Sequence, residues 1–440
     1  MEQRTEISDM GTELNPGAQI RTSFGEEWTV KRLLGEGGQG YVYLIERNHT
    51  QKALKWYKPR MASRRFYEHI RKNVIDGSPS SGYIWPTDTT EFNGTTFGYI
   101  MDLRPEGFYD MTDILLKQVD FVSFRRVVDA AMNIVNDLRV LHNKGYSYQD
   151  LNDGNFFIDP KTGRVLICDN DNVATNGEPT VVLGKPRYMA PEIVLRRNMP
   201  NIYSDRFSLA LIIFRLLTNG HPLEGKRTVG RTLTPEAQSV IYGNDPVFLF
   251  DPDDDRNRPD PVIHRNEILI WHCLPEYMKN IFLRAFSKEG LMTPNRRPTE
   301  ADWIDVLVRF RSNIVTCSCG NEVFVDDEGK AVCDQCGKKV KIPFWLQLPE
   351  YRIPGMRDSR IYRCQTCIAN PDRALEPVAR VLAARNDPGR LGIRNMSSEP
   401  WNAVTTKGVN RKVEPNGVIP LKAGIRFRSN DSTITINGGE

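Results

Sequence analysis

Alternating apolar and polar residues dominate the chain from Glu26 to Leu103, and this alternation predicts β-strands. Four stretches show it, reading WTVKRLL, YVYLIE, KALKWY and FGYIMDL in chain order. One stretch with helical spacing, RRFYEHIRKN, lies between the third and the fourth. The pattern therefore predicts a strand-rich unit that contains one helix.

From Asp110 to about Arg311 the apolar residues recur at the spacing of amphipathic helices. The clearest example is FVSFRRVVDAAMNIVNDLRVLHNKG, in which Gly145 is a stop signal. The segment 244–263 is rich in Pro and Asp and is predicted to be a surface loop. Its acidic run lacks the spacing and the glycine of an EF-hand, which favours a solvated face over a calcium site. A strand-rich unit joined to a larger helical unit is an α+β arrangement.

These changes of pattern divide the chain into successive segments, and we find no internal repeat. The last of them, which includes VIPLKAGIRFRSNDSTITING, alternates turn residues with short strands and predicts a small all-β domain. The predicted boundaries are a flexible polar lead at 1–24, the strand-rich unit at 25–103, the helical unit at 104–312, a cysteine-rich segment at 313–345, a linker with helical character at 346–390, and the β-domain at 391–440.

Composition agrees with a soluble globular protein, with 40% hydrophobic and 26% charged residues. The longest apolar run, FSLALIIFRLL, contains an arginine and is too short to span a bilayer, so we predict a core helix and no membrane partner. The polar N-terminus resembles neither a secretory signal nor a transit peptide, and we expect a cytoplasmic protein. A net charge of +4 is small for this length and gives no support for nucleic-acid binding.

A glycine-rich stretch, RLLGEGGQGYVYLIE, lies between the first two predicted strands and contains Gly35, Gly37 and Gly40. Glycines at this spacing are weak evidence for phosphate binding, because a strained hairpin explains them equally well. The rest of the chain therefore has to decide between these two interpretations.

Four polar residues downstream follow in the order that phosphate transfer requires. Lys55 lies on a predicted strand, Asp150 and Asn155 occur in DLNDGN, and Asp169 ends the apolar stretch VLICD. Phosphoryl transfer needs a backbone cradle, a lysine on the phosphates, oxygen ligands for Mg²⁺ and a carboxylate that orients the attacking hydroxyl. Each residue alone has an ordinary structural explanation, but together they predict that the glycine loop holds phosphate.

Residues 26 to about 312 resemble a bacterial protein kinase of the eukaryotic Ser/Thr type. Besides the residues above, PRYMAPEI supplies an Ala-Pro-Glu motif ending at Glu192, YSDRFSLA places Asp205 in a long helix, and NRRPT offers Arg297 as a partner for Glu192. The resemblance implies a bilobal kinase-like fold, ATP and Mg²⁺ as cofactors, and a protein substrate on the platform that the Glu–Arg pair braces.

The resemblance also implies a role for each matching position. Asp150 would accept a hydrogen bond from the substrate hydroxyl, and Asn155 and Asp169 would bind Mg²⁺. Lys55 would bind the α- and β-phosphates and be held by Glu68. Gly35, Gly37 and Gly40 would cover the phosphates, and Val42 and Ala53 would lie on either side of the adenine. Met101 would be the gatekeeper, and Asp102 and Leu103 would form the hinge.

The chain departs from the family pattern around the catalytic aspartate. Asn152 stands where the family has a lysine, which removes a cation from the transferring phosphate, and Lys185 in GKPRYMAPE is the candidate replacement. Tyr148-Gln149 replaces the usual His-Arg. Without that arginine an activation-loop phosphate loses its usual partner, so we expect no need for phosphorylation at Thr175 or Thr180.

The usual Asp-Phe-Gly triplet reads Asp169-Asn170-Asp171 here. Loss of the Phe and Gly argues against the inactive state in which that triplet flips. For Asp171 the sequence favours a turn over contact with a second metal ion.

These departures leave two alternative functions open. A small-molecule phosphotransferase would share the two aspartates and the asparagine without the lysine, although the Ala-Pro-Glu motif and Arg297 favour protein substrates. A nucleotide-binding pseudokinase scaffold is the other alternative, and the retention of Lys55 and the three metal and catalytic residues argues against it.

Six of the eight cysteines lie between Cys317 and Cys367. In TCSCGNEVFVDDEGKAVCDQCGKK, the pairs Cys317-x-Cys319 and Cys333-x-x-Cys336 predict a Cys₄ site for Zn²⁺, and the segment resembles a zinc ribbon. Cys364-x-x-Cys367 could complete a site with the second pair or form a reducible pair. The other two cysteines, Cys168 and Cys273, lie outside this region and are predicted to be core residues.

A closed Cys₄ site is structural, so we assign the zinc to folding and to docking of a protein partner. The order of kinase, ribbon and β-domain is similar to bacterial kinases that are associated with a von Willebrand A protein and a PP2C-type phosphatase in tellurite-resistance-type systems. That resemblance implies these two proteins as partners of the C-terminal module.

Overall fold

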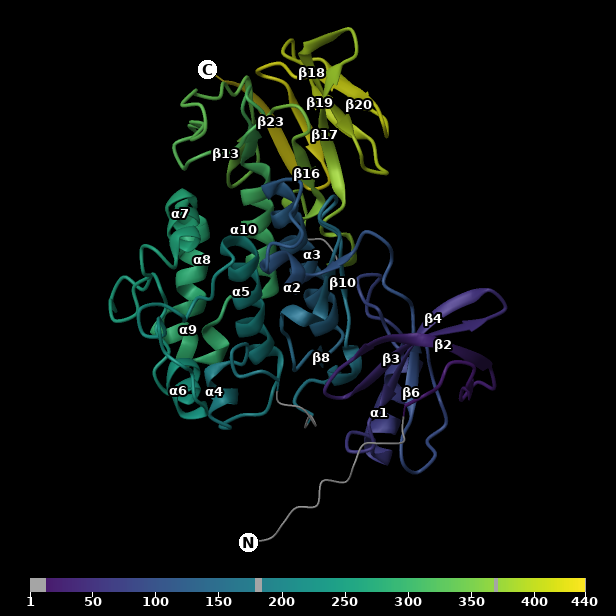
Figure 1. Cartoon of the computed structure of the whole chain (residues 1–440). Coiled ribbons are helices and arrows are strands. Elements are labelled where there is room, and N and C mark those ends of the chain that lie inside the picture. Colours follow the sequence, from purple (N-terminus) through teal and green to yellow (C-terminus); the bar gives the residue numbers. More distant parts are fainter. Residues whose placement is uncertain (1–12, 179–183, 368–370, 440) are drawn as a thin grey trace.

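The computed structural model describes residues 13–178, 184–367 and 371–439 (Figure 1). A strand-rich lobe lies beside a larger helical lobe, and a β-rich C-terminal part lies at one end of the helical lobe. No helix within the described ranges is both long enough and apolar enough to cross a membrane.

The strand-rich lobe is an antiparallel six-stranded sheet with the order β1-β2-β3-β4-β6-β5. Its first strand lies in the segment that the sequence predicts to be a flexible lead, and this prediction is wrong for the described part of the lead, because Ile20 pairs with Trp28 and is buried. Residues 1–12 lie outside the described residues. The strands are β1 (Gln19–Arg21), β2 (Glu27–Glu36), β3 (Gly40–Arg47), β4 (Thr50–Tyr57), β5 (Asp88–Thr89) and β6 (Gly98–Met101).

Helix α1 (Arg64–Asp76) packs on this sheet. Its N-cap is Ser63, whose side chain accepts a hydrogen bond from the backbone N–H of Phe66. Phe66 and Ile70 lie on the buried face, in one apolar cluster with Tyr57 of β4. The helix is thereby fixed against the strand that carries Lys55.

The helical lobe surrounds α5, which is apolar on nearly every side and buried, as the sequence predicts for a core helix. Two short strands, β9 and β10, form a hairpin on which the candidate metal-binding residues lie. The helices are α2 (Met111–Leu115), α3 (Phe124–Asn143), α4 (Pro191–Val194), α5 (Ile202–Thr218), α6 (Pro235–Ser239), α7 (Arg265–Cys273), α8 (Glu276–Phe286), α9 (Lys288–Met292) and α10 (Glu300–Ser312). The short strands are β7 (Tyr109–Asp110), β8 (Tyr146–Ser147), β9 (Phe156–Ile158), β10 (Val165–Ile167) and β11 (Ala174–Thr175).

A buried charged cluster joins three helices of this lobe. His142 of α3 contacts Glu300 of α10 through Nδ1 at 3.0 Å and Asp205 of α5 through Nε2 at 3.1 Å. Burial alone would lower the pKa of His142, but the two carboxylates outweigh it and raise the pKa from 6.5 to about 9. Protonated His142 therefore stabilises the packing of these helices.

We expect this stabilisation to be lost in alkaline solution. Because the pKa is higher in the folded chain, the contribution is fully present below pH ~6.5 and disappears as the pH rises through about 9. The loss should be on the order of 3 kcal/mol of unfolding free energy. Thermal unfolding at pH 6, 8 and 10 would measure it, with His142→Gln as the variant that lacks the titration. Equal pH dependence in both proteins would contradict the prediction.

The C-terminal part begins with a hairpin of β12 (Ile314–Thr316) and β13 (Glu322–Phe324), which carries the first cysteine pair. Two further sheets follow, with the orders β15-β14-β23-β22-β19-β20 and β16-β17-β18-β21. Their apolar faces share one core, which includes Leu346, Trp401 and Ile436. The strands are β14 (Phe344–Gln347), β15 (Arg352–Pro354), β16 (Arg360–Tyr362), β17 (Pro377–Ala384), β18 (Asp387–Asn395), β19 (Trp401–Val404), β20 (Asn410–Val413), β21 (Val418–Pro420), β22 (Arg426–Ser429) and β23 (Ser432–Gly438).

The predicted linker with helical character at 346–390 is therefore wrong. Apart from two short 3-10 turns, Arg363–Gln365 and Pro371–Arg373, the regular structure of its described residues is strands of the same two-sheet unit, which begins at Phe344 and not at 391. The pairing of Phe344 with Gly438 and of Leu346 with Ile436 joins positions some ninety residues apart, which a local pattern does not reveal.

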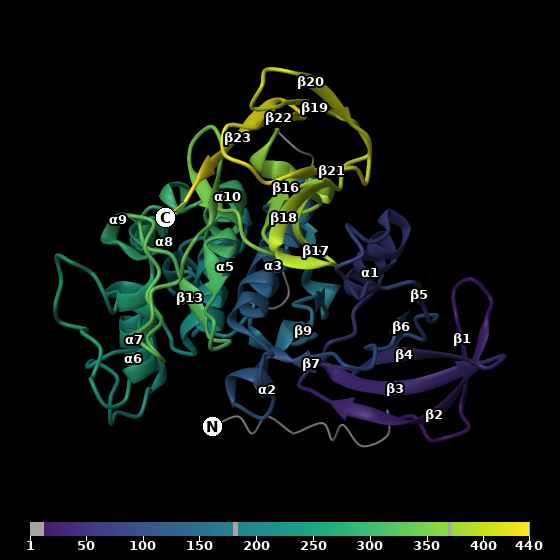
Figure 2. The same ribbon diagram turned by 90° about the horizontal axis from the view of Figure 1, so that it is seen from above.

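This C-terminal part packs directly on the helical lobe, over α3 and α10 (Figure 2). Arg309 of α10 lies between two aromatic rings, 3.9 Å from the centroid of Tyr277 and 5.2 Å from that of Tyr351. Arg125 of α3 pairs with Glu322 of β13 at 3.1 Å. These cation–π and ionic contacts fix both the cysteine-bearing hairpin and the two-sheet unit to the helical lobe.

Candidate active site

The glycine loop connects β2 to β3, and its glycines have different structural requirements. A Cβ on Gly40 would lie 2.2 Å from the carbonyl oxygen of Trp56, so packing against β4 requires glycine there. A Cβ on Gly35 or Gly37 would meet no atom of the described residues within 4 Å. Packing within the chain thus explains Gly40, whereas Gly35 and Gly37 leave open space beside the loop, into which a ligand can approach the backbone.

Lys55 of β4 is buried and reaches three oxygen atoms. Its Nζ lies 2.7 Å from Oδ2 of Asp171, 3.2 Å from Oδ1 of Asp169 and 3.0 Å from Oε1 of Gln39. Burial alone would lower the pKa of Lys55, but the two carboxylates raise it well above its ordinary value. Lys55 is therefore a cation held between the strand-rich lobe and the helical lobe.

The predicted pair between Lys55 and Glu68 is wrong. Glu68 is exposed on α1 and pairs with Arg64 at 2.8 Å and with Arg71 at 3.6 Å. The neighbouring residue, His69, faces the site, with its Nε2 3.1 Å from the carbonyl oxygen of Asp171. Consecutive helical residues point about 100° apart, so an acidic residue one position from the buried face lies beside the site without entering it.

Asp150 follows β8 in a loop that Asp205 holds in place. The backbone N–H groups of Tyr148 and Gln149 donate to the Asp205 carboxylate at 2.6 and 3.1 Å. Burial raises the pKa of Asp150 to about 6, opposed by the charge of Lys185 and by a hydrogen bond from Asn152. The loop therefore presents Asp150 as a partly buried carboxylate in a fixed position.

Asn155 and Asp169 lie side by side at the base of the β9–β10 hairpin. The backbone N–H of Cys168 donates to the carbonyl of Asn155 at 2.8 Å, which brings the two positions together. The Asp169 side chain is half-exposed, and Asn155 uses its Oδ1 to accept from the N–H of Asn152 at 2.7 Å. One carboxylate oxygen and an amide oxygen with a second lone pair fit the preference of Mg²⁺ for oxygen ligands.

Lys185 lies beside the catalytic loop, as proposed from the sequence. Its Nζ donates to Oδ1 of Asn152 at 2.9 Å, and the amide nitrogen of Asn152 donates in turn to the carboxylate of Asp150. Gly184 has φ +83°, and a Cβ there would lie 2.8 Å from Oδ1 of Asp150. Glycine at 184 therefore allows the segment that carries Lys185 to approach Asp150 closely.

The residues predicted to contact adenine share one apolar cluster. Val42 and Ala53 lie in it with Met101 and Leu103, and the adjoining hinge residue Asp102 pairs with Lys52 at 2.7 Å. The helical lobe also contributes to this cluster, and two of its members, Phe157 of β9 and Leu166 of β10, were missed by the sequence analysis.

The pair predicted between Glu192 and Arg297 is present and bidentate. Both terminal nitrogens of Arg297 donate to the Glu192 carboxylate, at 2.8 and 2.7 Å. Arg297 is almost fully buried and also donates to the carbonyl of Leu291. The start of α4, where the Ala-Pro-Glu motif lies, is thus tied to the segment before α10.

Comparison with known proteins agrees with this geometry, since residues 28–243 match the family model of the protein kinase domain. This part of the chain is thus similar to protein kinase domains. The chain is 24% identical over 319 residues to Protein kinase YegI of Escherichia coli K12, which covers 68% of this chain and 47% of that protein. It is 28% identical over 204 residues to Mitogen-activated protein kinase kinase kinase 17 of Arabidopsis thaliana, covering 44% of this chain and 53% of that protein.

The chain thus spans about half the length of these curated relatives. Among solved structures it is similar to the kinase domain of PknI from Mycobacterium tuberculosis, at 18% identity and a TM-score of 0.44. That match covers 67% of this chain and 98% of the PknI chain. By position in the chain, the strand-rich lobe with α1 is called the N-lobe below, and the helical lobe is called the C-lobe.

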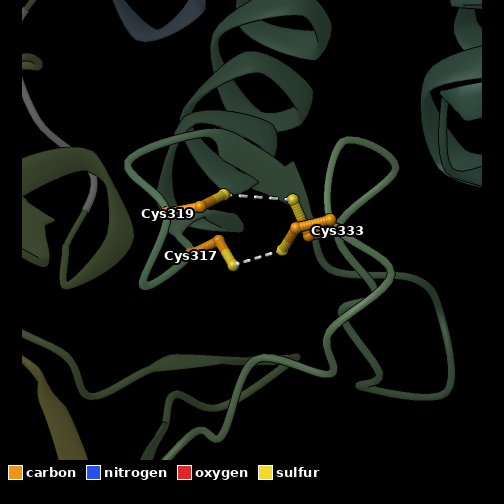
Figure 3. Close-up of side chains that lie close together, drawn as sticks. Cys317, Cys319 and Cys333 are labelled. Atoms are coloured by element: carbon orange, nitrogen blue, oxygen red, sulfur yellow. Dashed lines mark hydrogen bonds between the residues drawn. The ribbon is translucent and has the colours of Figure 1, made fainter.

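C-terminal to the kinase domain, four cysteines converge from two loops (Figure 3). The Sγ atoms of Cys317 and Cys336 lie 3.6 Å apart, as do those of Cys319 and Cys333, and all four lie within 4.8 Å of one another. Four thiolates about 2.3 Å from a tetrahedral Zn²⁺ would be separated by ~3.8 Å. The donor set and its spacing fit zinc.

The remaining cysteines do not join this cluster. Cys364 and Cys367 line a groove formed with α10 and the β22–β23 turn, so they do not complete a site with Cys333 and Cys336. Cys168 is buried, as predicted. Cys273 is exposed, so its prediction as a core residue is wrong; it ends α7, where the helix reaches the surface.

Proposed function

We propose that this protein is an ATP- and Mg²⁺-dependent protein kinase that transfers the γ-phosphate to a serine or threonine hydroxyl. The observation that carries the proposal is the convergence of Lys55, Asp150, Asn155 and Asp169 where the two lobes meet. The relatives named as kinases support it. A cytoplasmic location is part of the same proposal.

Each residue would do one part of the reaction. Asp150 would accept the hydrogen bond of the substrate hydroxyl and orient its oxygen toward the phosphate. Lys55 would hold the α- and β-phosphates beneath the glycine loop. Asn155 and Asp169 would hold Mg²⁺, which neutralises charge on the phosphates when it is bound.

The braced Ala-Pro-Glu segment favours a protein acceptor over a small molecule. Transfer of labelled γ-phosphate from ATP by the purified chain would test this, with a generic basic protein and, separately, small hydroxyl compounds as acceptors. Label on serine or threonine of the protein is the expected result. Label only on small molecules would support a small-molecule phosphotransferase, and ATP binding without any transfer would support a scaffold.

We expect Lys185 to compensate for the missing lysine at position 152. Lys185→Met should reduce the maximal rate by about 10²-fold, because the transferring phosphate then lacks a nearby cation. The double variant Lys185→Met/Asn152→Lys should recover much of this loss, since it restores the cation at the family's usual position. Initial rates at saturating ATP would measure both, and a Lys185→Met enzyme as active as the wild type would contradict the assignment.

We also expect activity without phosphorylation of the activation segment. Gln149, in place of the arginine, donates to Ser147 and to the carbonyl of Glu178, and Thr175 accepts from Lys72 of α1 at 3.0 Å. The sequence analysis missed this lysine. The unmodified segment is thus already held in place up to Glu178, and Thr175→Ala should retain the wild-type initial rate to within about twofold. A tenfold loss would contradict this; Thr180 lies outside the described residues.

The C-terminal module would serve docking and not catalysis. We propose that its four cysteines bind one structural Zn²⁺ and that the two-sheet unit binds a protein partner. A von Willebrand A protein and a PP2C-type phosphatase remain the predicted partners. Association that persists with a catalytically inactive kinase domain would support docking by this module.

A further inference from the structure

Asp171 is a buried carboxylate that the proposed reaction leaves without a role. Its side chain is fully buried, and Oδ2 accepts from Lys55 at 2.7 Å and from the hydroxyl of Tyr57 at 2.6 Å. The other oxygen, Oδ1, has no hydrogen-bond partner among the described residues. A carboxylate in such a place is retained only if its charge is compensated, and Lys55 is the compensating cation.

Helix α1 contacts residues 171–173 through neutral groups. His69 faces the carbonyl of Asp171, and Asn73 donates to the carbonyl of Val173 at 3.2 Å. The helix has two acidic residues: Glu68 is half-exposed and pairs with its two arginine neighbours, and Asp76 accepts a hydrogen bond from the hydroxyl of Tyr146. Among the described residues, α1 therefore supplies no carboxylate to Lys55.

We propose that Asp171 is the positioning residue for Lys55, in the place that the family resemblance assigned to Glu68. The inference rests on the proposed function and concerns how that site is assembled. Asp169 also touches Lys55, but at the longer distance of 3.2 Å and with a half-exposed side chain that is free to turn toward a metal ion. Asp171, which also accepts a hydrogen bond from Tyr57, keeps its ion pair with Lys55 when Asp169 turns toward a metal ion.

This arrangement changes what a movement of α1 can do. A glutamate on α1 would lose Lys55 whenever the helix swings outward. Asp171 belongs to the C-lobe segment after β10, next to the metal-binding position, so Lys55 keeps its partner as long as the two lobes stay together. Helix α1 would then affect the site through its neutral contacts with the backbone of residues 171–173 and through the contact of Lys72 with Thr175.

The test compares Asp171→Asn with Glu68→Gln, which make the same chemical change at the two competing positions. Asp171→Asn should lower kcat by about 10²-fold with a smaller change in the KM for ATP, because Lys55 is then misplaced for the reaction more than for binding. Glu68→Gln should change either value by less than about twofold. Equal losses in the two variants, or no loss in Asp171→Asn, would overturn the proposal.

Two readouts do not depend on activity. Acetylation of Lys55 by an amine-reactive reagent without nucleotide, measured by mass spectrometry, should rise at least several-fold in Asp171→Asn and stay unchanged in Glu68→Gln. If Asp171→Asn folds poorly, the double variant Lys55→Met/Asp171→Asn should unfold at a higher temperature than Asp171→Asn, since it removes a buried cation that has lost its buried carboxylate and keeps only the half-exposed Asp169. Unchanged acetylation, or no recovery in the double variant, would overturn the proposal.

These readouts distinguish failure of the proposed function from failure of the inference about Lys55. A wild-type chain that transfers no phosphate, yet shows protected Lys55 that Asp171→Asn exposes, would contradict the proposed function and keep the inference about Lys55. If the wild-type chain is active and Asp171→Asn changes neither its rate nor the protection of Lys55, the proposed function is kept and the inference about Lys55 is contradicted.

Discussion

Asp150→Asn is expected to reduce phosphate transfer by about 10³-fold while leaving the fold and ATP binding intact. The asparagine has nearly the same size, so the backbone bonds from Tyr148 and Gln149 to Asp205 remain. The variant lacks the carboxylate that we propose orients the acceptor hydroxyl and receives its proton. Because Asp150 does not contact the nucleotide in this assignment, the dissociation constant for ATP should not change.

Initial rates with labelled ATP, equilibrium binding of ATP and thermal unfolding would measure the three quantities on one preparation. Asp120→Asn is a matched control, because Asp120 is largely exposed and pairs only distantly with Lys117, at 3.7 Å. It should behave as the wild type in every measurement. An Asp150→Asn enzyme that keeps more than about a tenth of its rate would contradict the catalytic role.

The structure brings together those predicted residues that lie in motifs of fixed spacing along the chain. Asp150, Asn155 and Asp169 lie on one loop and one hairpin, so their separation in sequence nearly determines their separation in space. The same reasoning found the pair of Glu192 and Arg297, which joins distant segments, because both lie in recognisable motifs.

The failures have a different physical origin. Whether Glu68 or His69 of α1 faces the site depends on the rotation of the helix about its axis, which tertiary packing of Phe66 and Ile70 decides. The ion pair of Lys55 with Asp171 was missed because a carboxylate within a polar turn has no local signal that it is buried. The strand pairing between residues 344–347 and 435–438 is likewise set by contacts far apart in the chain.

Removal of zinc is expected to unfold the segment 314–343. The apolar cluster around the cysteines is small, and the backbone there forms only two short strands, β12 and β13. A core of this size does not hold a fold without a metal or disulfides. Two of its buried members are Cys317 and Cys333 themselves, so their thiolates would lose the cation that compensates their charge.

We therefore expect one zinc ion per chain by elemental analysis, and loss of hydrogen-exchange protection over 314–343 when it is chelated. Cys333→Ser should give the same loss without chelator, whereas Cys273→Ser, at an exposed cysteine outside the cluster, should not. Trp345 packs on this cluster and lies on β14 of the six-stranded sheet, so the loss should extend to that strand. Full protection in a zinc-free chain would show that the four thiols hold this segment by packing alone, and would remove zinc from the proposal.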